Sequence, residues 1–184
     1  MFPEKIRKKI YRLRVPTGFL GAILILIVAR PSLLTIIVGA IISLFGFSLR
    51  AWASGHIEKE KNLTISGPYQ FTRNPLYLGN FILGISLSIS SNSWLGILIF
   101  LIYFVTFYPV AIAREVEKMK QLFPEEYKKY QSKVPTFFPN LKISLGLGNK
   151  KFSGKLYLKN KEYRALLGGL VIWAILLLKY FLLS

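Results

Sequence analysis

Apolar residues run along this chain in long blocks, separated by short polar or charged stretches. A helix needs about 20 apolar residues, at about 1.5 Å each, to cross the roughly 30 Å hydrocarbon layer of a bilayer. Within that layer the backbone must satisfy its own hydrogen bonds, so the blocks predict helices. The pattern therefore predicts an all-α, polytopic integral membrane protein with about five transmembrane helices. The predicted spans are Val15–Ala29, Ser32–Trp52, Leu76–Ser90, Trp94–Ala113 and Ala165–Leu183.

Two very short links join the first block to the second and the third to the fourth, which predicts two antiparallel helix hairpins. After the fourth block, Arg114–Phe123 is expected to continue the helix out of the membrane. Pro124 and the two acids that follow it predict a new cytoplasmic helix, because proline and acidic residues suit a first turn. Apolar side chains recur here at three- and four-residue steps, which favours a packed face. The stripe consists of Val116, Met119, Phe123, Tyr127 and Tyr130.

The chain is read as one domain over residues 1–184. Residues 1–52 form its N-terminal hairpin, 63–139 its motif-bearing core and 165–183 its C-terminal helix. The stretch 142–154 is rich in glycine and lysine, so we expect it to be a mobile link.

Charge is strongly unbalanced, because 25 Lys and Arg residues face eight acids, for a formal net charge of +17. Basic residues gather in the N-terminal stretch and in residues 50–73 and 114–164, and only Arg30 and Lys179 lie elsewhere. If all five blocks span, the positive-inside rule places the N-terminus and both large loops in the cytoplasm and the C-terminus outside. Anionic lipid headgroups explain the charge better than nucleic acid does. We expect membrane lipids as partners, no nucleic acid, and a prokaryotic cell membrane as the location.

The chain has no cysteine and a single histidine, His56. This composition excludes a disulfide framework, a thiolate metal site and a cysteine nucleophile, and we expect no metal. His56 is either a hydrogen-bonded structural residue or a proton acceptor, since imidazole alone titrates near neutrality without perturbation.

The loop between the second and third blocks carries candidate chemistry. Ser66–Tyr69 is a turn signal, and Asn74 and Pro75 are expected as the cap and first residue of the next helix. Arg73 stands just before this helix, where its charge opposes the helix dipole. An anionic ligand carboxylate is one explanation of that placement, and a contact with a lipid phosphate or positive-inside orientation is the alternative.

Glu115 lies just past the fourth apolar block, near the predicted membrane boundary. An acid at this depth is costly unless it is paired. Its expected partner is Arg114, Arg73 or a cationic ligand, and an ordinary surface pair is equally open.

Two stretches resemble the isoprenylcysteine carboxyl methyltransferase and phospholipid methyltransferase family. The first is Ser66–Gly79, and the second comprises Arg114-Glu115, Leu122–Tyr130, Val134-Pro135 and Pro139. Members of this family are integral membrane enzymes that use S-adenosylmethionine. The resemblance implies that the loop before the third helix and the segment after the fourth enclose this cofactor.

The resemblance also implies a set of cofactor-binding positions. A carboxylate such as Glu115 suits the ammonium or ribose hydroxyls of the cofactor, and tyrosine faces suit its sulfonium. Arg73 would hold the site together or meet an anionic group. The sequence departs from the family at Asn74, where histidine is usual, and at Val116, where an acidic pair is reduced. The implied cofactor-binding residues are Leu63, Thr64, Tyr69, Asn74, Pro75, Leu76, Tyr77 and Glu115.

These observations predict a membrane methyltransferase dependent on S-adenosylmethionine. Its acceptor would be an amphiphilic or lipid-like molecule with its head at the cytoplasmic interface, and His56 and Arg73 are the catalytic candidates. The alternative is a non-catalytic membrane protein of the same fold that binds lipid or a partner. A nicotinamide-dependent membrane reductase is a third hypothesis, because some sterol reductases resemble this family in their C-terminal region.

Overall fold

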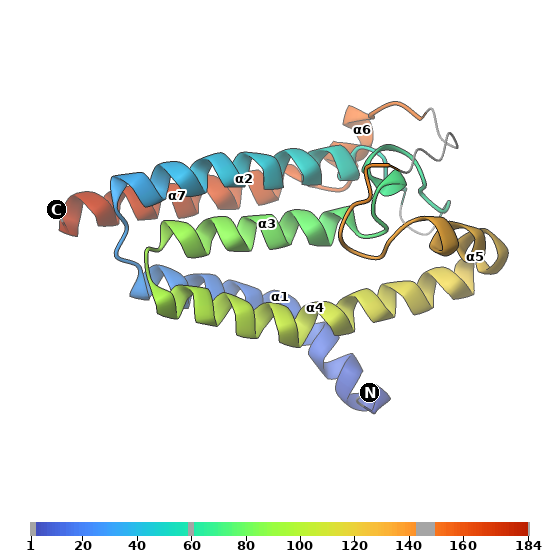
Figure 1. The fold of residues 1–184 in the computed structure, drawn as a ribbon, viewed down its shortest axis with the longest axis horizontal. Coiled ribbons are helices and arrows are strands. Elements are labelled where there is room, and N and C mark those ends of the chain that lie inside the picture. Colours follow the sequence, from blue (N-terminus) through green and yellow to red (C-terminus); the bar gives the residue numbers. More distant parts are fainter. Residues whose placement is uncertain (1–2, 59–60, 143–149, 184) are drawn as a thin grey trace.

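The computed structural model describes residues 3–58, 61–142 and 150–183. Figure 1 shows two layers of helices, with α2, α3 and α7 in one and α1 and α4 in the other. All regular elements in these ranges are helical, which confirms the predicted all-α architecture. They are α1 (Glu4–Val28), α2 (Leu33–Ser54), the short 3₁₀ helix η1 (Gly67–Gln70), α3 (Pro75–Ser90), α4 (Trp94–Leu122), α5 (Pro124–Lys133), α6 (Gly154–Lys159) and α7 (Tyr163–Leu183).

Among the described residues, four helices are long and apolar enough to cross a membrane, namely α1, α2, α4 and α7. Helix α3 has 16 residues and a length of about 24 Å, which falls short of a full span. The predicted five spans are therefore four long helices and one shorter apolar helix. The 29-residue α4 extends past its neighbours, as expected for Arg114–Phe123 (Figure 1).

Helix α1 begins at Glu4, eleven residues before the predicted start of its apolar block. The start of the apolar block does not coincide with the start of the helix, because the early turns of α1 are stabilised by contacts with α4. Arg7 donates to Glu117 of α4 over 2.5 Å, and Tyr103 of α4 donates to the Arg14 carbonyl over 3.0 Å. The predicted mobile link falls largely on residues 143–149, which lie outside the described residues.

The two predicted hairpins are confirmed, and their links meet at one end of the bundle. The Arg30 backbone N–H donates to the Ser91 carbonyl over 2.8 Å, and Asn92 donates from its side chain to the Arg30 carbonyl over 3.1 Å. Lys179 of α7 donates to two carbonyls in the last turn of α1, over 2.8 and 2.7 Å. A cation suits this position, because a helix ends with unsatisfied carbonyls and a negative dipole end.

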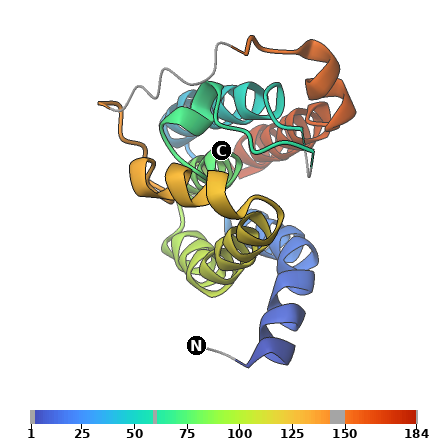
Figure 2. The same ribbon diagram turned by 90° about the vertical axis from the view of Figure 1, so that its right-hand side faces the viewer.

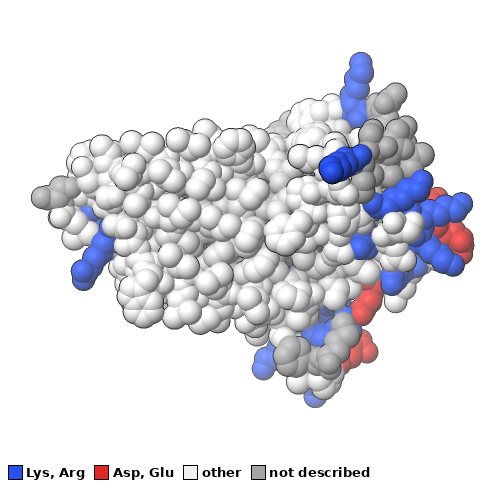
Figure 3. Space-filling view, in the orientation of Figure 1, with Lys and Arg blue, Asp and Glu red and all other residues white. Residues whose placement is uncertain are grey.

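Basic side chains gather at the opposite end, beyond the uncharged middle of the face that Figure 3 presents. The N-terminus lies toward this basic end and the C-terminus toward the end with the links (Figure 1). The basic end also carries η1 and α5, which Figure 2 shows lying across the end of the bundle.

Helices α2 and α3 pack closely through glycine and serine, as small residues allow in membrane helices. The Ser86 hydroxyl donates to the Gly39 carbonyl over 2.9 Å. A Cβ added at Gly39 would lie 2.8 Å from the Ser86 carbonyl oxygen and would also meet the Ser90 hydroxyl. Since backbone cannot swing aside as a side chain does, this approach requires glycine.

We expect Gly39→Ala to lower the stability of the protein in detergent by about 1–3 kcal/mol, as overpacking does in other cores. Thermal unfolding followed by circular dichroism measures the change. Gly168→Ala in α7 is the matched control, because a Cβ there meets nothing within 4 Å. Equal unfolding temperatures for Gly39→Ala and the parent would contradict the close approach.

Candidate functional site

The end of the bundle is closed by a contact between two stretches that are far apart in sequence, residues 63–74 and residues 116–140. Three buried side chains, Tyr127, Tyr130 and Val134, form its apolar centre. The predicted apolar stripe of α4 and α5 is thus confirmed as a packed face, and its partner is the loop before α3. The partly buried side chains that complete the cluster are Leu63, Ile65, Val116, Met119 and Phe123.

Backbone hydrogen bonds fasten the same two stretches. The Arg73 N–H donates to the Pro135 carbonyl over 2.9 Å, and the Thr72 hydroxyl donates to the Phe137 carbonyl over 2.8 Å. Thr72 is almost fully buried. Since these bonds involve backbone on at least one side, they set the register of the loop against the segment after α5.

A cavity of about 520 Å³ lies inside this closed end. Ligand cavities in proteins commonly have volumes of about 300–1,000 Å³. All eight positions implied as cofactor-binding line it, together with Arg73, so the two motif stretches do meet around one cavity. Its walls are Tyr11, Arg14, Val15, Arg50, Ile57, Glu58, Asn62, Leu63, Thr64, Tyr69, Arg73, Asn74, Pro75, Leu76, Tyr77, Asn80, Glu115, Lys118, Met119, Tyr127 and Tyr130.

Arg73 holds the wall of the cavity together. Its guanidinium donates to the Tyr127 hydroxyl over 2.9 Å and to the Thr136 hydroxyl. The neighbouring Asn74 is the N-cap residue of α3 and Pro75 its first residue, which confirms the predicted helix start, although the Asn74 side chain makes no cap hydrogen bond. Its amide instead donates to the Thr136 carbonyl over 2.8 Å, because the loop turns Asn74 toward the segment after α5.

Glu115 meets a partner that the sequence reasoning did not consider. Tyr11 of α1 donates to its carboxylate over 3.2 Å, while the Arg114 guanidinium lies over the Tyr11 ring at 4.7 Å from the centroid. Helix α1 therefore supplies a third wall, with Tyr11, Arg14 and Val15. The sequence signal that could have predicted this wall is the pair Tyr11 and Arg14, which are three residues apart on one helix face at the edge of the first apolar block.

A charged network that the sequence reasoning also missed lies at the membrane side of the cavity. Arg50 of α2 forms two hydrogen bonds with Glu162, over 2.6 and 3.0 Å, and donates to Asn80 of α3. Both charged side chains are mostly buried. Arg50 and Asn80 stand in apolar helices, where polar residues usually face the interior of the bundle. The sequence therefore contained a signal from which this network could have been predicted.

Three buried polar side-chain atoms have no hydrogen-bond partner within the described part of the chain, and all three belong to walls of this cavity. They are the Tyr69 hydroxyl, Nε of Arg73 and Nη1 of Arg14. A buried donor without a partner costs about 1–3 kcal/mol, so such groups normally have one. The cavity therefore offers donors for a ligand that carries acceptor atoms, beside the Glu115 carboxylate as an acceptor.

Burial raises the pKa of the Tyr69 phenol, which keeps the hydroxyl protonated at neutral pH. Its backbone carbonyl accepts a 2.6 Å hydrogen bond from the Tyr130 hydroxyl. The ring is thus anchored through the backbone of its residue, while its own hydroxyl remains available as a donor.

A sequence model of the phospholipid methyltransferase family matches residues 19–126, more than half of this chain. The chain belongs to the phospholipid methyltransferase family. The match begins inside α1 and ends inside α5, so this family region includes both Tyr77 and Glu115.

Two bacterial proteins resemble this family member over about half of its length. It is 32% identical over 99 residues to the cobalt-zinc-cadmium resistance protein CzcN of Cupriavidus metallidurans. The aligned region covers 53% of this chain and 45% of that protein. It is 32% identical over 96 residues to the nickel-cobalt-cadmium resistance protein NccN of Alcaligenes xylosoxydans xylosoxydans, with 51% and 45% covered. The chain thus spans about half the length of the curated relatives that it matches. No solved structure matches it significantly.

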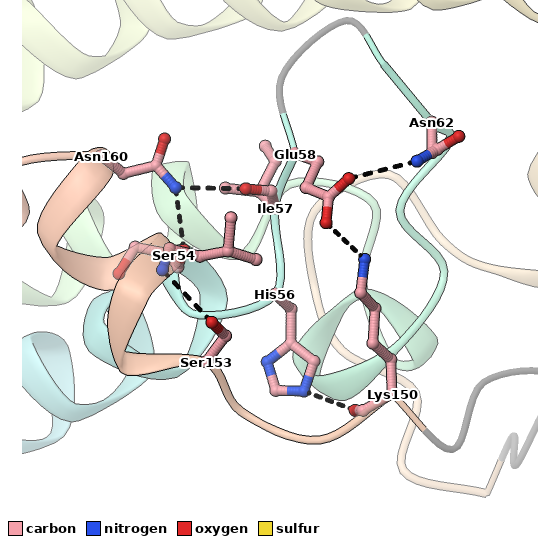
Figure 4. A network of polar contacts seen from close by, with 9 residues as sticks. Ser54, His56, Ile57, Glu58, Asn62, Lys150, Ser153 and Asn160 are labelled. Atoms are coloured by element: carbon pink, nitrogen blue, oxygen red, sulfur yellow. Dashed lines mark hydrogen bonds and ion pairs between the residues drawn. The ribbon is translucent and has the colours of Figure 1, made fainter.

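His56 is absent from the walls of the cavity in this phospholipid methyltransferase family member. Its Nδ1 lies 2.9 Å from the Trp52 carbonyl and its Nε2 lies 3.0 Å from the Lys150 carbonyl, toward which Figure 4 shows the ring pointing. Because both ring nitrogens face backbone carbonyls, this placement supports the structural alternative for His56 and gives no support to a catalytic one. The described residues contain no group of three or more His, Asp or Glu placed to hold a metal.

Polar contacts surround His56 (Figure 4). Two residues that take part in them, Glu58 and Asn62, also line the cavity and form its polar rim. Glu58 accepts hydrogen bonds from Lys150 over 2.7 Å and from Asn62 over 3.2 Å. The Lys150 ammonium lowers the pKa of the Glu58 carboxyl, which keeps it charged at the rim. Asn160 donates to the Ser54 carbonyl over 2.9 Å, so the segment before α7 is fixed to the end of α2.

We expect Tyr69→Phe to leave the free energy of unfolding unchanged or slightly higher, because its hydroxyl has no partner among the described residues to lose. Tyr130→Phe should instead lower it by about 1 kcal/mol, since this change removes the hydrogen bond to the Tyr69 carbonyl. Thermal unfolding of both variants checks the contrast. A clear loss of stability in Tyr69→Phe would mean that its hydroxyl is already satisfied.

Proposed function

We propose that this protein is a membrane methyltransferase that uses S-adenosylmethionine and acts on an amphiphilic acceptor. One observation carries the proposal: both motif stretches of a methyltransferase family enclose a single cavity with an acid and three donors that have no partner within the described ranges. The cavity lies at the basic end of the bundle, where a soluble cofactor and the head of a membrane-bound acceptor can meet.

The groups on the walls fit the chemistry of the cofactor. S-adenosylmethionine carries a sulfonium, an ammonium, a carboxylate and ribose hydroxyls. Glu115 suits the ammonium or the hydroxyls, and Nε of Arg73 and the Tyr69 hydroxyl suit the carboxylate or other acceptor atoms. The aromatic faces on the walls suit the sulfonium by cation–π attraction. The tyrosines on the walls are Tyr11, Tyr69, Tyr77, Tyr127 and Tyr130.

When bound, the cofactor supplies an electrophilic methyl group. Transfer is an in-line displacement, so the protein must align the acceptor atom and exclude water. Tyr77 is suited to this task because its ring is fixed edge-on against Tyr108, at 5.6 Å between centroids. No step is assigned to His56, which faces away, and a proton released by the acceptor passes to water at the polar rim.

The proposed setting is a bacterial cell membrane, with the basic end of the bundle in the cytoplasm. Positive residues at one end favour this orientation, and both relatives come from bacteria. Anionic lipid headgroups would contact the same basic end.

A non-catalytic protein of the same fold is the second candidate. It is favoured by Asn74 and Val116, which depart from the family, and by relatives named for metal resistance and not for methylation. A nicotinamide-dependent reductase, the third hypothesis, gains no observation in its favour.

Calorimetry of the purified protein in detergent with S-adenosylmethionine separates the first two candidates. We expect saturable binding that Glu115→Gln weakens about tenfold or more, because a hydrogen bond to a charged group contributes about 1.5–3 kcal/mol. The unfolding temperature should stay nearly unchanged, since glutamine has the same shape and its side-chain oxygen can accept the long hydrogen bond from Tyr11.

Glu117→Gln is the matched control, because Glu117 lies two residues further along α4 and pairs with Arg7 outside the cavity. It should bind the cofactor like the parent. Absence of binding by the folded parent would favour the non-catalytic candidate. If the parent does bind the cofactor, mass spectrometry of membrane lipids would identify the acceptor. The acceptor is the lipid that gains the mass of one methyl group only when the protein is expressed.

A further inference from the structure

The segment that follows α5, residues 136–142, combines exposed apolar side chains with positive charge. Two large apolar residues in it have little cover, since Phe138 is 71% exposed and Leu141 is 78% exposed. Residues 128–142 also contain four lysines and no acid, and all four lysines are exposed. Exposed apolar side chains that lie together on a surface mark an interaction site, so this segment calls for a partner.

Hydrogen bonds fix the backbone of this segment level with the start of α3. The Phe137 carbonyl accepts from the Thr72 hydroxyl over 2.8 Å, and the Asn140 N–H donates to the Phe71 carbonyl over 3.0 Å. The side-chain oxygen of Asn140 accepts from the Lys142 N–H over 3.1 Å, which closes the last turn of the segment. The segment is therefore held against the loop that leads directly into α3.

Aromatic contacts place this level at the boundary of the apolar layer. Phe137 contacts two apolar helices, with its ring centroid 5.7 Å from Phe81 of α3 and 5.8 Å from Phe104 of α4. The Phe71 ring lies 6.3 Å from Trp52, a partly exposed residue near the end of α2. Tryptophan is enriched where a membrane meets water, so the segment runs at the height of this interface.

The segment also extends sideways from the bundle. Figure 2 looks onto the basic end and shows the orange chain after α5 reaching past the outline of the long helices. At the height of the interface, the space beside these helices belongs to lipid. The exposed ring of Phe138, which stands edge-on to Phe137 at 5.3 Å between centroids, is part of this overhang.

We infer that residues 136–142 form a membrane anchor, in which Phe138 and Leu141 enter the lipid leaflet at the basic end of the bundle. The exposed lysines of residues 128–142 contact anionic headgroups of the same leaflet. Apolar side chains gain by leaving water for the acyl boundary, and an anionic surface attracts nearby lysines. A second copy of this chain is a poorer partner, because a symmetric contact would set lysines against lysines.

The anchor joins the bilayer to the wall of the larger cavity. Thr136, the first residue of the segment, accepts a 2.8 Å hydrogen bond at its carbonyl from Asn74 and a further one at its hydroxyl from Arg73. Both donors line that cavity. The anchor itself does not rest on the proposed function, because it needs neither a cofactor nor an acceptor.

The chain contains no cysteine, so a spin label can be attached at one chosen position. The test labels Phe138→Cys in the full chain, in vesicles of phosphatidylcholine and phosphatidylglycerol, and measures its accessibility to oxygen and to a water-soluble nickel chelate by electron paramagnetic resonance. We expect high oxygen and low nickel accessibility, as for a side chain about 5–10 Å below the headgroups. Glu125→Cys, at an exposed acid of α5, is the water-facing control, and Phe19→Cys, at a residue of α1 that is 70% exposed, is the lipid-facing control.

A Phe138 label as accessible to the nickel chelate as the Glu125 label would overturn the anchor. A label shielded from both reagents would overturn it too, because that result means a protein partner. In vesicles of phosphatidylcholine alone we expect a shallower label, and equal depth in both kinds of vesicle would overturn the role of the lysines.

If the label at Phe138 disturbs the fold, a photoreactive phosphatidylglycerol in vesicles with the unmodified protein decides. Labelling is then expected in the peptide that contains Phe138 and Leu141, and labelling confined to the long helices is the contrary result. Since no cofactor is added in either experiment, a failure of the anchor leaves the methyltransferase proposal standing, and a failure of that proposal leaves the anchor standing.

Discussion

The contact between residues 63–74 and residues 116–140 is the constraint on which the rest of the site depends. Helix α3 is too short to reach the end of α4, so the loop before it must be held in place by something other than its own helix. The apolar cluster around Tyr127 and the backbone hydrogen bonds of Thr72 and Arg73 do this. Because of that contact, residues 63–77 face Glu115 across a shared cavity. Without it, they would face solvent or lipid.

Polar groups that would be costly in an apolar bundle are concentrated around this cavity. Arg50 is compensated by Glu162 and Asn80. These bonds tie the residue just before α7 to α2 and α3, although that residue lies outside the region that matches the family. The Tyr69 hydroxyl and the free guanidinium nitrogens of Arg14 and Arg73 have no such compensation among the described residues. Buried donors without a partner are rare in native folds, so three of them on the walls of one cavity single out this part of the bundle.

Much of the architecture was predictable, because block length and hairpin links depend on local sequence alone. The start of α1 at Glu4 was not, since it depends on contacts with α4 that no local pattern contains. For the site, the resemblance brought together the residues of the loop and Glu115, but it said nothing of α1. Tyr11 and Arg14 reach the cavity only through the packing of α1 on α4. Asn74 is the N-cap residue as predicted, but its side chain donates to Thr136 for an equally non-local reason. The single histidine was a natural candidate by chemistry, yet its neighbours are the Trp52 and Lys150 carbonyls.

Photo-crosslinking of S-adenosylmethionine to the purified protein, followed by peptide mapping, tests the central claim most directly. If one cavity joins the two stretches, saturable labelling will appear both in residues 63–77 and in the part of α4 around Glu115, and excess unlabelled cofactor will suppress it in both. Labelling confined to one stretch, or found only in the middle of α7, would contradict a shared cavity.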